Sequence, residues 1–301
     1  MAASMLGFVS SLSSPRGRRS LCRARAATTQ LYSNWGKPVV PNTNLALPKP
    51  LLISIEGNIG AGKSTLLDAL RESNPDWVFI DEPVGVWSAF RNEGGENMLE
   101  VFYRDRKRWS YTFQNCALLT RFQNIETAIG AHNEKLIQQE TESATSALEF
   151  GGRNNRNPDI GSFLGNDKKL KRQIFITERC LDTDYQVFTK MLRAEGSIDK
   201  LEYDLYERWF TQLKISATPL SAIIHVDTTP EICAQRIVKR GRDGEEAIPL
   251  EYLQALDTFQ RIWVNSGDVP CIHTSADGVA GVIDFVERES LTHANVESRK
   301  E

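Results

Sequence analysis

Residues 51–65 read LLISIEGNIGAGKST, and this stretch decides the fold. The apolar run 51–56 is typical of a buried parallel strand, and a helix is expected from Lys63 to Glu72. Between them, residues 57–64 match the pattern G-x-x-x-x-G-K-[ST] in the strand-then-helix context that it requires. Glycines let backbone N–H groups approach phosphate oxygens, and the helix N-terminus adds positive potential. The stretch therefore predicts a site for a nucleoside triphosphate.

Two side chains of this loop suit a nucleotide bound with its metal ion. Lys63 is expected to reach the terminal phosphates, and the Ser64 hydroxyl is expected to bind Mg²⁺, the predicted cofactor. The residues expected to contact ATP here are Gly57, Asn58, Ile59, Gly60, Ala61, Gly62, Lys63, Ser64 and Thr65. The loop by itself does not identify the group that accepts the phosphate.

The rest of the chain alternates strands with helices, which favours an α/β fold: a parallel sheet with helices on both faces. Further strands are expected at 77–81, 174–178, 222–227 and 271–275. Further helices are expected at 108–138, 182–193, 198–215, 230–239, 249–264 and 279–289. Residues 139–172 contain Gly, Asn and Ser without a period, and are expected to form a long surface insertion.

Charged residues follow two of these strands, at the edge where open α/β sheets bind ligands. Glu82 follows the second strand and could accept a proton from an attacking hydroxyl; the alternative is a solvated residue before a proline. Glu178 and Arg179 end the third strand. Glu178 could act on Mg²⁺, directly or through water, and Arg179 could stabilise a transferred phosphoryl group. The alternative for these two is a surface ion pair.

Three arginines surround the end of the helix 230–239. Arg236 and Arg240 share one helix face, and Arg242 follows Gly241. Three guanidinium groups close together favour the binding of an anion. A mobile arginine lid over the ATP phosphates would explain why they occur here. The alternative is an exposed basic patch.

The helix 108–138 carries one polar stripe, made of Gln114, Ala117 and Arg121. A planar base would provide hydrogen-bond partners for Gln114 and a stacking face for Phe113. The alternative is an aromatic core cluster with a polar residue at its edge.

The composition excludes several classes of protein. The chain has 301 residues and a net charge of −3, which argues against a general nucleic-acid binder. No run of 18 apolar residues predicts a membrane-spanning helix. The five cysteines are isolated, so neither a zinc site nor a disulfide framework is expected, and reduced buried thiols are favoured.

The N-terminal segment has a different composition from the rest. Residues 1–55 contain no acidic residue and carry a charge of +7, whereas the remaining residues carry −10. Residues 1–30 are rich in Ser, Ala and Arg, which indicates a transit peptide for a mitochondrion or plastid. The alternative is a basic tail on a cytoplasmic protein. We expect a disordered leader and Pro-rich linker over 1–49, a folded domain over 50–292 and a polar tail over 293–301.

Five motifs, in this order, resemble the deoxyribonucleoside kinase family over about residues 51–290: GNIGAGKST, DEPVGVW, RWSYTFQNCALLTR, TERCLDTD and IVKRGRDGEEAIPLEYL. The resemblance implies a P-loop nucleoside-kinase fold with a five-stranded parallel sheet, and a homodimer. It implies transfer of the γ-phosphate of a nucleoside triphosphate to the 5′-hydroxyl of a deoxyribonucleoside, in nucleotide salvage. Two alternatives stay open: a thymidylate-type monophosphate kinase, and a non-catalytic relative that serves as a structural subunit of an organellar complex.

The resemblance also implies roles for residues that match the motifs. Glu82 would be the general base, and Arg179 would lie near the 5′-oxygen. Tyr103 and Glu245 would bind the sugar 3′-hydroxyl, and Gln114 would bind the base. The base pocket would be walled by Trp87, Leu99, Phe113 and Phe188, and the lid would consist of Arg236, Arg240 and Arg242. Cys180 stands where the family commonly has Ser, which weakens any hydrogen bond made there.

Arg121 and Asp184 are expected to pair beside the base, because either charge alone would be costly to bury. Asp184 precedes Phe188 by four residues, so both are expected on one helix face toward the pocket. Within the family, this pair accompanies cytosine and purine acceptors. Deoxycytidine, deoxyadenosine or deoxyguanosine is therefore expected as the acceptor, with thymidine poor. The alternative is a structural ion pair that does not affect specificity.

Overall fold

The structure is a computed structural model that describes residues 47–150, 172–242, 245 and 248–297. Its centre is a five-stranded, all-parallel sheet with strand order β2-β3-β1-β4-β5, which confirms the expected fold class. The strands are β1 (Leu51–Glu56), β2 (Val78–Ile80), β3 (Ile174–Glu178), β4 (Leu220–Val226) and β5 (Cys271–Thr274). Because all five are parallel, their carboxyl ends meet at one edge, where ligands bind in such sheets.

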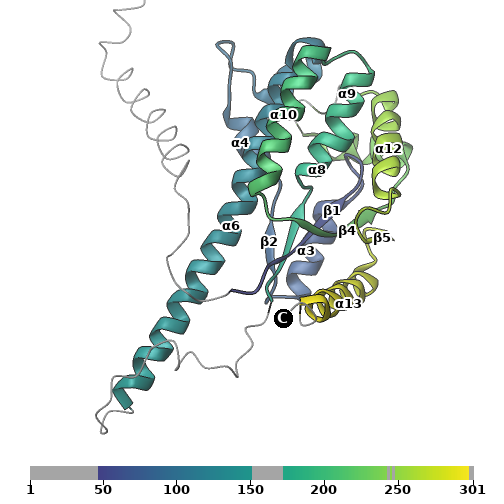
Figure 1. Cartoon of the computed structure of the whole chain (residues 1–301). Coiled ribbons are helices and arrows are strands. Elements are labelled where there is room, and N and C mark those ends of the chain that lie inside the picture. The colour runs from purple at the N-terminus through teal and green to yellow at the C-terminus, as the bar shows by residue number, and fades with distance from the viewer. Residues whose placement is uncertain (1–46, 151–171, 243–244, 246–247, 298–301) are drawn as a thin grey trace, which may run out of the picture. The chain divides into compact units, whose positions relative to one another are not determined.

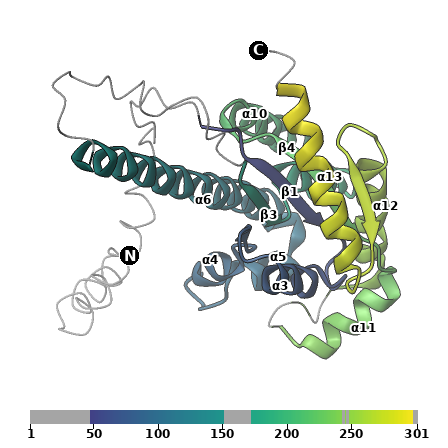
Figure 2. The same ribbon diagram turned by 90° about the horizontal axis from the view of Figure 1, so that it is seen from below.

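Helices cover both faces of this sheet (Figures 1 and 2). They are α3 (Lys63–Ser73), α4 (Val84–Ala89), α5 (Met98–Arg104), α6 (Arg106–Phe150), α8 (Leu181–Thr183), the π-helix η1 (Asp184–Thr189), α9 (Lys190–Ala194), α10 (Lys200–Ser216), α11 (Pro230–Arg240), α12 (Leu250–Val264) and α13 (Val279–Glu297).

Alternate residues of β1 and β3 enter two different core clusters, as the period of a strand requires. Leu52 and Phe175 pack with side chains of α6 and α10. Ile53 and Ile176 belong to the larger cluster, which includes side chains of α3 and α13. The sheet is therefore buried on both faces, which explains why its strands are continuous apolar runs.

The helix α6 is longer than the sequence analysis expected. It runs from Arg106 to Phe150 instead of ending near 138, and in Figure 1 it continues well past the sheet. The expected insertion therefore starts too early, because residues 139–150 are helical. These residues contain no Gly or Pro, and three Glu and two Ala among them favour a helix; the glycine that follows is Gly151. The remainder of the insertion, 151–171, lies outside the described residues.

Three other expectations differ from the structure. The single helix expected at 182–193 is divided into α8, η1 and α9, because six residues adopt the wider π-helical turn. Helices α4 and α5 were not expected, although a capping box between Asn97 and Glu100 begins α5. Helix α13 extends to Glu297, into the expected polar tail, because no Gly or Pro interrupts it after Gly281. Residues 298–301 lie outside the described residues.

The expectations for the N-terminus and the cysteines are tested only in part. Residues 1–46, which include the expected leader and Cys22, lie outside the described residues. Cys116, Cys180, Cys233 and Cys271 are free thiols, the second and third of them buried. In the described part of the chain, no helix has both the length and the apolar character needed to cross a membrane.

Candidate active site

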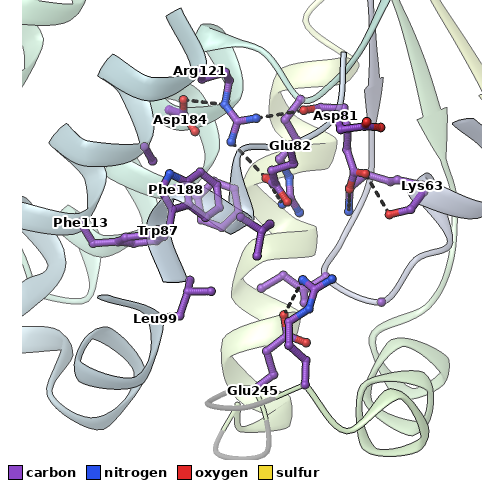
Figure 3. A pocket seen from close by; sticks show the side chains of 18 of the residues that line it. Lys63, Asp81, Glu82, Trp87, Leu99, Phe113, Arg121, Asp184, Phe188 and Glu245 are labelled. Atoms are coloured by element: carbon purple, nitrogen blue, oxygen red, sulfur yellow. Dashed lines mark hydrogen bonds and ion pairs between the residues drawn. The ribbon is translucent and has the colours of Figure 1, made fainter. Parts of the chain in front are cut away.

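A cleft of about 360 Å³ lies at the carboxyl ends of β1, β2 and β3 (Figure 3). It brings together eighteen of the residues expected at the site: Ile59, Gly60, Lys63, Ser64, Glu82, Trp87, Leu99, Tyr103, Phe113, Gln114, Arg121, Glu178, Arg179, Asp184, Phe188, Arg240, Arg242 and Glu245. Trp87, Leu99, Phe113 and Phe188 lie to one side of Glu82 in Figure 3, and Lys63 lies to the other. The cleft therefore has an aromatic end and a phosphate-loop end, and Glu82, the expected general base, lies between them.

The phosphate loop has a backbone that only glycine adopts without strain. Gly60 has a φ of +79°, and a Cβ there would lie 2.7 Å from the carbonyl oxygen of Cys233. A Cβ on Gly57, at φ +150°, would lie 2.8 Å from the carbonyl oxygen of Val226. The loop is consequently packed closely against β4 and α11, and it leads into the N-terminus of α3, a place where anions bind.

The Lys63 ammonium group is held inside the loop. Its Nζ donates a hydrogen bond to the carbonyl oxygen of Asn58 at 2.9 Å and lies 3.7 Å from Oε1 of Glu178. Burial and the nearby Arg179 lower the pKa of Lys63 to about 8, against the opposing effect of Glu178. The side chain is therefore oriented toward the place where the terminal phosphates are expected.

Ser64 and Glu178 provide two oxygen ligands side by side. Ser64 Oγ donates a hydrogen bond to Glu178 Oε2 at 2.9 Å. Mg²⁺ prefers oxygen ligands and commonly takes one or two from the protein, with waters and substrate phosphates as the others. These two residues fit that requirement. Among the described residues, no group of three or more His, Cys, Asp or Glu side chains forms a metal cage.

Glu82 lies at the centre of a buried charge network. Its Oε1 accepts hydrogen bonds from Arg179 Nη1 at 3.0 Å and from Arg121 Nη2 at 3.1 Å. Burial alone would raise the pKa of Glu82, but the two guanidinium groups outweigh it and hold that pKa at about 2. Glu82 is therefore an ionised carboxylate at neutral pH, able to accept a proton.

The expected pair between Arg121 and Asp184 is present, with 2.9 Å between Arg121 Nε and Asp184 Oδ2. Arg121 is only 2% exposed, and it also donates from Nη1 to the carbonyl oxygen of Glu178 at 2.9 Å. The sequence analysis missed the contact of Arg121 with Glu82. No spacing could reveal it, because α6 and the end of β2 meet only in the folded chain.

The aromatic end of the cleft is a tightly packed cluster around Phe113. Its ring centroid lies 5.3 Å from that of Trp87, edge to face, and 4.7 Å from that of Phe102. Gln114 follows in the same helix; it is 1% exposed, and its Oε1 has no hydrogen-bond partner among the described residues. An unsatisfied buried acceptor is costly, so a ligand donor is the chemical complement of this position.

The lid arginines are partly occupied by another expected site residue. Arg240 and Arg242 both form ion pairs with Glu245, and Arg242 Nη1 lies 3.2 Å from Glu245 Oε1. Arg236 Nη1 instead donates to the carbonyl oxygen of Ala61 at 2.7 Å and does not line the cleft. Two of the three arginines therefore have a carboxylate of the chain itself as their anionic partner, and Arg236 has a neutral backbone acceptor.

The remaining expected ATP contacts stand behind the cleft surface or outside it. Gly57, Asn58, Ala61, Gly62 and Thr65 do not line it; Asn58 Nδ2 is turned to the carbonyl oxygen of Leu253, and Thr65 is exposed. The cleft also contains an unexpected exposed triad, in which Arg71 bridges Asp68 and Asp81. Only Arg71 and Asp68, three apart on α3, left a signal in the sequence.

The comparisons with known proteins agree with this geometry. A family model described as deoxynucleoside kinase matches residues 53–148 and 160–296. The chain is 28% identical to the deoxycytidine kinase of Mus musculus, over 74% of this chain and 79% of the relative. It is 31% identical to deoxycytidine kinase 2 of Gallus gallus, over 70% and 73%. It is 28% identical to the mitochondrial deoxyguanosine kinase of Xenopus laevis, over 74% and 77%. The chain therefore belongs to the deoxynucleoside kinase family and is a deoxyribonucleoside kinase.

Proposed function

We propose that this kinase transfers the γ-phosphate of ATP, bound with Mg²⁺, to the 5′-hydroxyl of deoxycytidine, deoxyadenosine or deoxyguanosine, and that it accepts thymidine poorly. Its role is nucleotide salvage, because the reaction converts a free nucleoside into a nucleotide. The observation that carries the base preference is the buried ion pair between Arg121, on the same stripe of α6 as Gln114, and Asp184 of η1.

Glu82 is the proton acceptor in this proposal. The 5′-hydroxyl loses its proton to Glu82, its oxygen attacks the γ-phosphorus, and the bond from that phosphorus to the bridging oxygen breaks, which releases ADP. The buried Nε of Arg179 has no partner among the described residues and is available to the reacting oxygens, while Lys63 neutralises the terminal phosphates. Bound Mg²⁺, held by Ser64 and Glu178, supplies neutralisation of the β- and γ-phosphate charge.

Tyr103 and Glu245 bind the sugar 3′-hydroxyl in this proposal. Burial raises the pKa of Tyr103, so its hydroxyl stays protonated and can donate. The Glu245 carboxylate can accept, and it also holds Arg240 and Arg242 near the phosphate end of the cleft. These arginines form a lid that closes over the ATP phosphates together with Arg236.

The charged pair favours some bases over others. Cytosine and adenine offer an amino donor to the carboxylate, and guanine offers a carbonyl acceptor to the guanidinium. Thymine instead places a methyl group against a charge, which is unfavourable in a buried site. The unsatisfied Oε1 of Gln114 supports the presence of a base as such. The names of the reported relatives, two deoxycytidine kinases and a deoxyguanosine kinase, support two of these three acceptors.

The direct test is to incubate the protein with ATP, with and without Mg²⁺, and each of the four deoxyribonucleosides, and to measure the monophosphate formed. Deoxycytidine or a purine deoxyribonucleoside should be the best acceptor, and chelation of the metal should abolish turnover. A preference for thymidine contradicts the base assignment. Phosphorylation of thymidine monophosphate would support a monophosphate kinase, and no turnover with any acceptor would support the structural subunit.

The double substitution Arg121→Met/Asp184→Ala tests whether the pair selects the base. It removes both charges together, so neither is left buried alone. The kcat/KM for thymidine should rise, because the methyl group no longer meets a charge. An ion pair of α12 outside the cleft, changed as Arg261→Met/Asp257→Ala, is a matched control. An unaltered thymidine preference would show that Arg121 and Asp184 are structural.

We also propose that the kinase forms a homodimer through α10. Three large apolar residues stand four apart on one face of this helix, with exposed fractions of 69% for Leu201, 42% for Leu205 and 56% for Trp209. A second copy of the same surface would cover them. Light scattering should give about twice the chain mass for the unaltered protein, and Leu201→Glu/Trp209→Glu should give the monomer. A monomeric unaltered protein would contradict this proposal.

The N-terminal address is a proposal as well: residues 1–49 direct the kinase to a mitochondrion or plastid. Their basic, acid-free composition supports it. If the segment is inert, the protein would be cytoplasmic.

A further inference from the structure

Arg179 has an unusual backbone for a side chain in an active site. It is the one residue other than glycine with a positive φ in the described part of the chain, at 63°. The left-handed region is unfavourable for an L-residue, so surrounding contacts must hold Arg179 there. The side-chain direction depends on this conformation, because φ determines where Cβ points.

Three hydrogen bonds hold the main chain around Arg179. Its own N–H donates to the carbonyl oxygen of Ile55 at 3.1 Å. Thr177 Oγ1 donates to the carbonyl oxygen of Arg179 at 2.9 Å. The N–H of Cys180 donates to Thr183 Oγ1 at 3.2 Å, which fixes the turn into α8. The Arg179 guanidinium then reaches Glu82 at 3.0 Å and the carbonyl oxygen of Gly57 at 3.1 Å.

The hydrogen bond from the Cys180 N–H to Thr183 depends on a buried carboxylate that the proposed mechanism does not use. Thr183 Oγ1 accepts from Cys180 and donates its own hydrogen to Glu56 Oε1 at 2.5 Å. Glu56 ends β1, is fully buried, and does not line the cleft. Ser54 Oγ also donates to Glu56 Oε1, and Gln260 Nε2 lies at 3.5 Å from its Oε2.

A carboxylate in this place needs an explanation. Burial raises the pKa of Glu56, against the opposing effects of Ser54, Thr183 and the two nearby arginines, so its ionisation is disfavoured by its surroundings. A buried carboxyl group that only filled space would be replaced without loss by an apolar residue. Glu56 is instead connected, through its hydrogen bond with Thr183, to the turn that follows Arg179.

We propose that Glu56 is a positioning residue: through Thr183 Oγ1 and the Cys180 amide, it holds Arg179 in the left-handed conformation that places its guanidinium on Glu82. The inference rests on the proposed function, in which Arg179 acts on the transferred phosphoryl group. Thr183 is the link in this chain, because its single hydroxyl both accepts from the turn and donates to Glu56.

Four variants separate positioning from simple stability. Thr183→Val removes the hydroxyl at constant shape, and Thr183→Ser keeps it. Glu56→Leu removes both acceptor oxygens, and Glu56→Gln keeps one. Ser110→Ala is the control for loss of a buried hydroxyl, because Ser110 Oγ is buried without a partner among the described residues. Each is measured for kcat, KM for both substrates, thermal unfolding and the pH dependence of kcat/KM.

Thr183→Val and Glu56→Leu should each lower kcat about ten- to hundredfold, with KM for the nucleoside changed less than threefold, because a misplaced reacting group affects mainly the chemical step. Thr183→Ser and Glu56→Gln should recover most of the lost kcat. The double variant Thr183→Val/Glu56→Leu should have a kcat no lower than that of the slower single variant. The acid limb of the pH profile should move upward in Thr183→Val, since Glu82 loses contact with Arg179.

The outcomes separate this inference from the proposed function. If the unaltered protein phosphorylates no deoxyribonucleoside, the function fails. If it is active and Thr183→Val keeps kcat within twofold, the positioning role is wrong. A Glu56→Gln variant as slow as Glu56→Leu also overturns it, since charge and not the hydrogen-bond chain would then matter. Should Glu56→Leu not fold, the Thr183 pair decides, because Thr183→Ser controls for folding.

Discussion

At the residue scale, one carboxylate oxygen carries much of the chemistry. Oε1 of Glu82 accepts from two guanidinium groups, each of which also holds a second partner: Arg121 bonds Asp184, and Arg179 bonds the backbone of Gly57. The carboxylate therefore cannot swing away from the cleft without breaking two charged hydrogen bonds. In the proposed mechanism, this order would hold the proton acceptor in place before the substrate arrives.

Glu82→Gln should lower kcat by about 10²–10⁴-fold, the usual contribution of a positioned base. The amide has the same shape but a far weaker proton affinity, so KM should change much less than kcat. Steady-state kinetics with the best nucleoside measure both. Glu72→Gln, on the exposed face of α3, is the matched control. Near-normal turnover of Glu82→Gln would remove this residue from the mechanism.

The pH profile depends on the same network. Arg179 and Arg121 outweigh burial and hold the pKa of Glu82 at about 2, below the ordinary 4.5. The stabilisation linked to this shift is complete above pH 4.5 and is lost as the pH falls toward 2. Ionised Glu82 should therefore keep kcat/KM free of an acid limb between pH 5 and 7.

Arg121→Met/Asp184→Ala should raise the pKa of Glu82, because one of its two cationic partners is gone. The acid limb of kcat/KM should then move toward the assayable range above pH 4, while Arg288→Met on the exposed face of α13 leaves it in place. Identical acid limbs in the double variant and the unaltered protein would show that Arg121 does not control the ionisation of Glu82.

At the scale of elements, the phosphate loop is shaped by close backbone approach. Its glycines meet β4 and α11 at distances that leave no room for a Cβ, so the loop conformation follows from packing as well as from its own flexibility. On the opposite side of the cleft, the π-helical turn η1 carries both Asp184 and Phe188 into the site. Such turns occur often at functional sites because they redirect side chains.

Gly60→Ala should impair nucleotide binding. The new Cβ would lie 2.7 Å from the carbonyl oxygen of Cys233 at a φ of +79°, so the loop must shift. We expect KM for ATP to rise at least tenfold and the free energy of unfolding to fall by about 1–3 kcal/mol, the cost of a strained backbone. Gly85→Ala is the control, because nothing lies within 4 Å of its Cβ position in α4. An unchanged KM in Gly60→Ala would contradict this account of the loop.

At the scale of the whole molecule, charge divides the chain. Residues 1–55 carry +7 and the rest carries −10, although β1 and the folded core begin only at Leu51. The sequence of residues 1–49 has no apolar period, so we expect the role of this segment to be separable from catalysis. The acidic remainder repels nucleic acid in general, which suits an enzyme of free nucleosides.

A chain that begins at Lys49 should fold and phosphorylate nucleosides with the same kcat/KM as the full chain. Residues 1–50 fused to a fluorescent protein should carry it to an organelle, as fluorescence microscopy can establish. A fusion in which the leader arginines are replaced by Gln is the control, because targeting depends on their charge. Diffuse cytosolic fluorescence of the unaltered fusion would contradict the transit peptide.

The elements differ in how far local pattern could predict them. The strands of the sheet are apolar runs between breakers, so their positions follow from the sequence to within two residues at each end. The end of α6 was predicted too early, because the region 139–172 as a whole contains Gly, Asn and Ser, whereas its first twelve residues contain no Gly, Pro or Asn. The π-helical turn η1 leaves no periodic signal, since packing against α12 and α6 selects it.

By itself, the sequence determined the parallel α/β sheet, the phosphate loop and the charged residues at the strand ends, because each depends on short patterns: apolar runs, glycine spacing and the residues that follow a strand. The expectation for Trp87, Leu99, Tyr103, Phe188 and Glu245 came from the resemblance of the motifs to a family. Only the tertiary structure decided which side chains meet. In the folded chain, Arg121 and Arg179 donate to the same oxygen of Glu82, and Glu245 forms ion pairs with the lid arginines. Glu56 is connected through Thr183 to the turn at Arg179. The physical reason is that these contacts of Glu82 and Glu56 join residues 39 to 127 positions apart, and their geometry depends on how strands and helices pack rather than on local preference.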